Sequence, residues 1–255
     1  MTYLELLFRR PDDGLIYPDQ ARQLVALACD GIDIDPGIFA RDASGKTLNG
    51  FYGQHTGVDG QPGISIPPRI VFDGGRGFIR LYGLGKAGAA LLQAQAPKLF
   101  AALYAHGFRS FDAKEGAMGI AWKDSGALPF YAIRTLVVAK KPAQCQRYIK
   151  APLEGDVAEQ VKASILRGLA GVAQMLDEEL MACGKSPMHL GAMPDTVEVL
   201  EGEPCPVSIN SGITAAGYKN LLLHFPCKFS GPWVTGMLRS RGYGLMRAIN
   251  PNRRA

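Results

Sequence analysis

The last fifth of this chain, residues 204–255, contains no aspartate or glutamate. Seven basic side chains lie in the same stretch: Lys219, Lys228, Arg239, Arg241, Arg247, Arg253 and Arg254. The formal net charge of +5 hides this asymmetry, because residues 154–203 carry 10 acidic and 3 basic side chains. A local field of one sign attracts polyanions, so the missing acids indicate a nucleic-acid partner.

Long hydrophobic runs are also missing. No stretch of about 18 apolar residues occurs, which argues against a membrane-spanning helix, and the first ten residues lack the pattern of a signal peptide. The five cysteines are odd in number, and no two have the spacing of metal ligands. We therefore expect a reduced, cytoplasmic protein with no metal site and no cofactor.

Familiar catalytic motifs are scarce. The four histidines are scattered, and no Gly-x-Ser-x-Gly motif occurs. The segment Gly83–Gly88, with the sequence GLGKAG, follows a predicted strand and opens a predicted helix, as dinucleotide fingerprints do. The strand before it belongs to a predicted hairpin, however, whereas a dinucleotide fold needs parallel neighbours. Glycines at a strand–helix corner are the simpler interpretation, and a dinucleotide-dependent oxidoreductase stays as an alternative.

Hydrophobic periodicity organises the first half of the chain. It predicts a strand at 3–8, a helix at 18–29, a hairpin at 69–82, a helix at 86–105 and a strand pair near 108–111 and 118–122. Residues 30–67 are rich in Gly, Asp and Pro and are typical of a long functional insertion. The order strand, helix, strand, strand, helix, strand is that of a ferredoxin-like unit. We expect a first domain at residues 1–128.

A second unit is predicted in residues 129–255. Its elements are a strand at 131–138, a long amphipathic helix at 155–183, and strands at 196–200, 218–225, 233–238 and 243–249. No second helix is evident, so this copy is degenerate. The predicted fold class is α+β, with two tandem ferredoxin-like units and a C-terminal glycine-rich loop at 231–247.

The glycine-rich loop carries the strongest functional signal. Its glycines, which let a backbone approach phosphates without interference from a Cβ atom, are Gly236, Gly242 and Gly244. Arg239 and Arg241 alternate on what reads as an extended segment, so both are expected on one face. A guanidinium grips phosphate through two parallel hydrogen bonds. A tight hairpin with incidental surface arginines is the alternative.

With two ferredoxin-like units and this loop, the chain resembles the repeat-associated RNA-binding superfamily of CRISPR systems. Within it, the chain looks like the endoribonucleases that cut precursor CRISPR RNA at each repeat hairpin, in particular the type IV branch. The resemblance implies metal-independent attack of the RNA's own 2′-hydroxyl, which leaves a 2′,3′-cyclic phosphate and a 5′-hydroxyl. It also implies retention of the mature 3′ hairpin and partner subunits in an effector complex. A noncatalytic subunit that caps the 5′ handle of the RNA is the alternative.

The resemblance also suggests where the catalytic groups lie. Many members use a histidine at or just after the first helix, but this chain has none in that helix. The matching region offers Arg22 on the helix, and Arg41 and His55 in the insertion. Either His55 is the base, or arginines alone position and stabilise the reacting phosphate, because a guanidinium is a poor base. Predicted phosphate contacts are Arg239, Arg241, Arg247 and, as a weaker candidate, Lys228.

Overall fold

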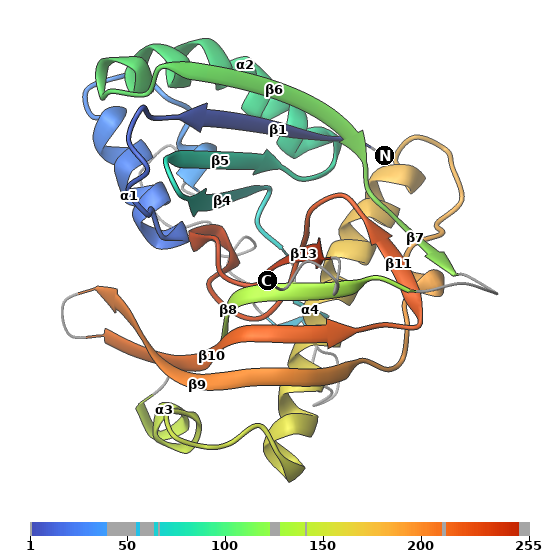
Figure 1. Ribbon diagram of the computed structural model, residues 1–255. Coiled ribbons are helices and arrows are strands. Elements are labelled where there is room, and N and C mark those ends of the chain that lie inside the picture. The colour runs from blue at the N-terminus through green and yellow to red at the C-terminus, as the bar shows by residue number, and fades with distance from the viewer. Residues whose placement is uncertain are drawn as a thin grey trace.

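The computed structural model describes residues 2–39, 55–56, 64–65, 67–122, 128–140, 142–210 and 213–249. Two antiparallel sheets, one from each half of the chain, form its framework (Figure 1). The first strand, β1 (Thr2–Arg9), shows how the first sheet buries one of its faces. Its side chains alternate between faces, so Leu4, Leu6 and Phe8 are buried together on one side, under the helices.

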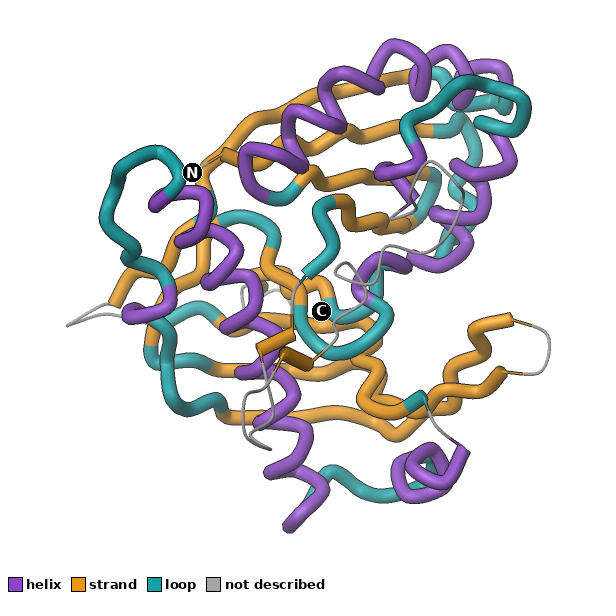
Figure 2. The backbone as a smooth tube through the Cα atoms, turned by 180° about the vertical axis from the view of Figure 1, so that it is seen from behind, coloured by secondary structure: helices purple, strands orange, loops and turns teal. Residues whose placement is uncertain are grey.

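The first half is a ferredoxin-like unit. Its elements are β1, α1 (Pro18–Ala28), β4 (Ile70–Gly75), β5 (Phe78–Gly83), α2 (Gly85–Ala105) and β6 (Ser110–Ala117). The sheet order β4-β5-β1-β6 places the first and third strands of the unit in the centre, with every pairing antiparallel. Both helices cover one face of the sheet (Figures 1 and 2). The fold class predicted from the sequence is therefore confirmed for this half.

The second half repeats this strand order. Its elements are β8 (Phe130–Ala139), α3 (Pro142–Tyr148), α4 (Gly155–Met181), β9 (Glu198–Asn210), β10 (Ile213–His224), β11 (Cys227–Ser230), β12 (Trp233–Val234) and β13 (Leu245–Ile249). The sheet order is β12-β13-β8-β10-β9, and α4 crosses one face of the sheet (Figure 2). A short strand and the glycine-rich loop stand between β11 and β13, where a complete unit has its second helix. The predicted degenerate copy is thus what the structure shows.

Two predicted details are wrong. The strands near 108–111 and 118–122 do not pair with each other, because β6 pairs with β1 and β7 (Gly119–Trp122) pairs with β11. The strand predicted at 196–200 runs to Asn210 as β9, through Pro204 and Pro206. Prolines are tolerated there because β9 is an edge strand, where a missing backbone N–H costs no ladder hydrogen bond.

The two halves share a core. Tyr3, Val71 and Tyr82 lie on the face of the first sheet that the helices leave open, and they belong to the same buried cluster as α4 and β8. From the insertion, the structure describes η1 (Pro36–Phe39) and two short paired strands, β2 (His55–Thr56) and β3 (Ile64–Ser65). None of the helices in the described ranges is long and apolar enough to cross a membrane.

Candidate active site

The glycine-rich loop is wedged between the two halves. Gly242 has a φ of +84°, and a Cβ atom there would lie 2.0 Å from the Phe72 carbonyl oxygen of β4 and 2.6 Å from Pro18 of α1. Gly244 donates a hydrogen bond from its N–H to the Thr135 carbonyl at 2.9 Å. Only glycine permits both the backbone conformation and the close approach. The loop therefore joins the start of α1 to the centre of the second sheet.

This packing gives the three glycines of the loop a structural role. Cβ atoms on Gly236, Gly242 and Gly244 would all collide with the protein itself, on Leu136, Phe72 and Thr235 respectively. Their bare backbone is used to fold the loop against its own chain, and the space beside them is filled by protein atoms. Phosphate contacts at these glycines stay a prediction.

Arg239 and Arg241 have different environments. They lie in a single 3-10 turn, η4 (Arg239–Arg241), so the expected extended segment with both arginines on one face is wrong. Arg239 is 4% exposed and donates a hydrogen bond to the Gly168 carbonyl of α4 at 3.4 Å. Burial lowers the pKa of its guanidinium to about 10. The structure therefore places Arg239 inside the protein, while Arg241 is partly exposed.

Arg241 lies beside the first turn of α1. The neighbouring Tyr243 is buried and donates a hydrogen bond to Asp19 of α1. Burial first, and then the Asp19 carboxylate, raise the pKa of Tyr243, whereas Arg241 acts in the opposite direction. Asp19 and Arg241 are thus close enough to act on one phenol. This arrangement fixes the loop to α1 through a buried, uncharged tyrosine.

Arg22 stands on the next turn of the same helix. It is partly buried and donates a hydrogen bond to the Phe39 carbonyl at 2.9 Å, and its guanidinium carbon lies 5.9 Å from the centre of the Phe39 ring. Arg22 and Arg241 therefore lie on two elements, α1 and η4, that pack against each other. One arginine comes from a rigid helix and the other from a loop fixed by buried contacts. We call this the α1–η4 junction.

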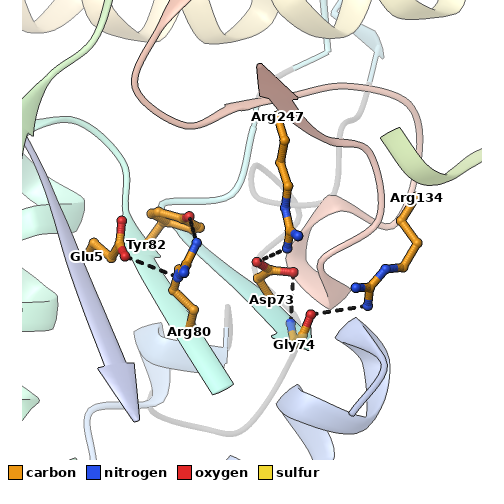
Figure 3. Close-up of polar contacts among 7 residues, drawn as sticks. All are labelled: Glu5, Asp73, Gly74, Arg80, Tyr82, Arg134 and Arg247. Atoms are coloured by element: carbon orange, nitrogen blue, oxygen red, sulfur yellow. Dashed lines mark hydrogen bonds and ion pairs between the residues drawn. The ribbon is translucent and has the colours of Figure 1, made fainter. Parts of the chain in front are cut away.

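A second group of charges crosses between the sheets (Figure 3). Asp73 of β4 is 2% exposed and forms an ion pair with Arg247 of β13. Arg134 of β8 donates a hydrogen bond to the Gly74 carbonyl at 3.1 Å. Burial, followed by the nearby Arg247, lowers the pKa of Arg134, while Asp73 partly opposes this. Arg247, predicted to grip phosphate, is thus held by a carboxylate of the other half.

Sequence reasoning missed both Asp73 and Arg134. The available signal was an arginine at the centre of the apolar strand FYAIRTLVVA, where an unpaired charge is costly. Arg80 lies on the face of the first sheet that the helices leave open. It pairs with Glu5 at 3.1 Å and donates a hydrogen bond to the Tyr82 hydroxyl at 2.9 Å (Figure 3). A strip of paired charges therefore extends from the α1–η4 junction across the seam between the halves.

Three further predicted site residues are Lys228, Arg41 and His55. Lys228 is exposed on β11, which pairs with β7 and not with the strands that carry the loop. Arg41 lies outside the described residues. The backbone of His55 is described in β2, whose partner β3 packs against α4, but its side chain lies outside the description.

The glycine segment Gly83–Gly88 is a strand–helix corner. Glu179 of α4 occupies the start of α2, where its carboxylate accepts hydrogen bonds from Lys86 N at 2.7 Å and Ala87 N at 3.4 Å and pairs with Arg69 at 2.5 Å. A helix N-terminus can bind phosphate only if its N–H groups are free. Because the protein's own carboxylate fills this position, the dinucleotide alternative is not supported. Among the described residues, no cluster of His, Cys, Asp and Glu could hold a metal ion.

Comparison with known proteins places this geometry in context. The model of the family described as type IV CRISPR-associated endonuclease Csf5 matches residues 1–251. A solved structure titled "Csf5, CRISPR-Cas type IV Cas6 crRNA endonuclease" superposes with a TM-score of 0.64 at 19% identity, covering 98% of this chain and 100% of that one. One titled "Crystal structure of Cas6b" gives a TM-score of 0.54 at 13% identity, with the same coverage. No curated protein matches.

Proposed function

Because this chain belongs to the family of type IV CRISPR-associated endonucleases, we propose that it cuts precursor CRISPR RNA at its repeat hairpins without a metal ion. The observation that carries the site assignment is the α1–η4 junction, where the helix that carries Arg22 packs against the turn that carries Arg241, at the seam of the two ferredoxin-like units. The C-terminal fifth of the chain, residues 204–255, supplies no acidic residue to oppose a polyanion. Together these features support an RNA substrate with its scissile phosphate at this junction.

The proposed reaction is a transesterification within the RNA. The 2′-oxygen forms a bond to the adjacent phosphorus as the bond from phosphorus to the 5′-oxygen breaks, which gives a 2′,3′-cyclic phosphate and a 5′-hydroxyl. The 2′-hydroxyl loses its proton, and the leaving oxygen gains one. The protein holds the 2′-oxygen, phosphorus and leaving oxygen in line, and stabilises the additional negative charge of the transition state.

Arginines are suited to stabilising the additional negative charge of the transition state. The guanidinium of Arg22 is oriented by Phe39, and that of Arg241 is carried by a loop that glycine packing holds in place. Two planar cations fixed before the substrate arrives need little rearrangement during the reaction. Arg41 is proposed as a third cation, and His55 stays the alternative general base, since a guanidinium removes a proton poorly at neutral pH.

The product is proposed to stay bound. Phosphate contacts from Arg241, and from other basic side chains of the acid-free C-terminal fifth, hold the hairpin on both sides of the cut. An enzyme that keeps its product turns over once and delivers the mature RNA to partner subunits of an effector complex. Slow, arginine-based chemistry is adequate for this task.

The test is incubation of the purified protein with a labelled repeat hairpin in excess EDTA. A single cut that leaves a cyclic-phosphate end supports the proposed function. Tight binding with the RNA left intact would overturn the catalytic assignment and favour the noncatalytic subunit that caps the 5′ handle. The hairpin with its sequence scrambled is the matched control, because it carries the same charge.

A further inference from the structure

A basic pocket lies beside the glycine-rich loop, which contributes Met237 to its lining. It has a volume of about 360 Å³ and is bounded by α3, the N-terminal half of α4, β8 and the loop. Pockets that hold small organic ligands are about 300–1,000 Å³ in volume. None of the residues that line it is acidic, and two of them, Arg147 and Arg167, are arginines. We call it the α3–α4 pocket.

The lining of this pocket is organised. Gln160 of α4 links two α3 residues, because its amide donates to the Tyr148 hydroxyl and accepts from an Arg147 guanidinium N–H at 2.9 Å. The Arg147 guanidinium carbon lies 5.9 Å from the centre of the Tyr148 ring. Val138 and Met237 contribute apolar surface. Aromatic and guanidinium planes beside amide groups are the features that proteins use to hold an unpaired base.

Arg167 is the unexplained member of this group. It is partly buried on α4, and within the described part of the chain it makes no hydrogen bond or ion pair. A cation in a pocket that has no ion-pair partner among the described residues is available to a ligand of opposite charge. A phosphate group provides that charge and two acceptor oxygens for the guanidinium fork.

The glycine-rich loop contributes residues both to the pocket and to the α1–η4 junction. Met237 lines the pocket and is fixed to β8 by a hydrogen bond from its N–H to the Val137 carbonyl at 2.8 Å. Four residues further on, the same loop presents Arg241 at the junction. An RNA that crosses the loop at the junction therefore has a pocket of nucleotide size within reach beyond the loop.

We propose that the α3–α4 pocket binds one unpaired nucleotide that flanks the repeat hairpin, with its phosphate on Arg167 and its base against Arg147 and Tyr148. This inference rests on the proposed function, because it takes the same RNA as ligand. The nucleotide in the pocket fixes the register of the hairpin relative to the scissile phosphate. The pocket thus makes recognition depend on the flank as well as on the stem.

An abasic scan of the flanks tests this directly. Single abasic sites keep the phosphate and remove the base, and binding is measured by fluorescence anisotropy for the wild type and for Arg167→Gln. We expect one flanking position at which the abasic site weakens wild-type binding about ten-fold, in the range for loss of one stacked base. Arg167→Gln should weaken binding of the intact flank. The same abasic site should then have little further effect, because a nucleotide whose phosphate is no longer held leaves the pocket and its base contacts are already lost.

The outcomes separate the two proposals. The pocket proposal fails, and the proposed function stands, if the wild type cuts the repeat but no abasic site in the flanks weakens binding. The same holds if the abasic site and Arg167→Gln weaken binding by independent factors that multiply. If free ribonucleoside monophosphate binds the wild type but not Arg167→Gln, and abasic sites have no effect, the pocket serves a free nucleotide and the proposal is overturned. Failure of the wild type to bind any repeat RNA removes both. Arg109→Gln, on an exposed arginine of the first unit, is the charge-matched control and should leave the scan unchanged.

Discussion

At the scale of single residues, two arginines two positions apart in one turn have separate tasks. Arg239 is buried against α4 and holds the glycine-rich loop in place, whereas Arg241 remains partly exposed beside α1. The sequence presents them as equivalent members of the motif RSRG. It could not distinguish them, because their burial depends on contacts with α4 and α1, which are distant in the chain.

The first prediction contrasts these arginines. Arg239→Ala should lower the free energy of unfolding by about 1–3 kcal/mol, because it empties a buried position and leaves the Gly168 carbonyl without this donor. Arg241→Ala should change stability by less than about 1 kcal/mol but reduce the salt slope of RNA binding by about 1, as expected for one lost phosphate contact. Urea unfolding and binding at several salt concentrations measure both. Equal stability losses, with an unchanged salt slope for Arg241→Ala, would contradict the assignment.

The second prediction concerns Arg22. Arg22→Ala should slow single-turnover cleavage about 100-fold while the RNA dissociation constant changes only a few-fold, because its proposed interaction strengthens in the transition state. Arg22→Lys should recover little, since an ammonium cannot make the two parallel hydrogen bonds. The exposed neighbour Gln23 supplies the control Gln23→Ala, which should cleave as the wild type does. A loss of affinity as large as the loss of rate would make Arg22 a binding residue instead.

At the scale of elements, local patterns predicted most of the helices and strands, and non-local contacts explain the exceptions. The apolar stripe of α4 includes Val161, Ile165 and Leu169, and all three are fully buried. The short α3 and the pairing of β7 with β11 were missed. Seven residues carry too little periodicity to identify a helix, and β7 and β11 are separated by more than a hundred residues.

The end of α4 provides a third prediction. Asp177 accepts hydrogen bonds from the N–H groups of Met188, His189 and Leu190, at 2.8–2.9 Å, and from the His189 ring. Burial alone would raise the pKa of Asp177, but these donors outweigh it, so the pKa lies below its ordinary value of 3.8. A carboxyl with a lowered folded-state pKa stabilises the fold above its unfolded pKa, and this stability is lost as the pH falls through the folded value.

Asp177→Asn should therefore be less stable than the wild type by a constant amount at pH 6–8, of about 1–2 kcal/mol. The difference should shrink as the pH falls below about 4, where the wild-type carboxyl becomes protonated. Thermal unfolding of both proteins across this range measures it. A difference that persists unchanged to pH 2 would show that the charge of Asp177 contributes nothing to the stability of this turn.

At the scale of the whole molecule, the proposed site depends on contact between the two halves. Arg22 and Arg241 are more than two hundred residues apart, and the contact between α1 and η4 follows from the packing of one sheet on the other. The sequence predicted the fold class and singled out Arg22 and Arg241 separately as candidates, but it did not predict the contact between α1 and η4. Asp73 and Arg247 show the same point, since each looks like an isolated surface charge until the sheets are placed together.

The fourth prediction tests this seam. Asp73→Ala should lower stability by about 2 kcal/mol, because it leaves Arg134 and Arg247 near each other without the shared carboxylate. This is below the range of about 3–5 kcal/mol for breaking a fully buried pair, since Arg247 is partly exposed. In the double variant with Arg247→Ala, part of the loss should be recovered, and a double-mutant cycle measures the coupling. Strictly additive losses would mean that the pair does not hold the halves together.

The most direct test of the account is cleavage of a repeat hairpin in which a single 2′-hydroxyl, on the nucleotide just before the cut, is replaced by hydrogen. The account predicts that the wild type, in excess EDTA, cuts the unmodified hairpin once to a 2′,3′-cyclic phosphate and binds the deoxy hairpin equally tightly without cutting it. Cleavage of the deoxy hairpin, or cleavage that disappears with EDTA, would contradict metal-free attack by the 2′-oxygen at the α1–η4 junction.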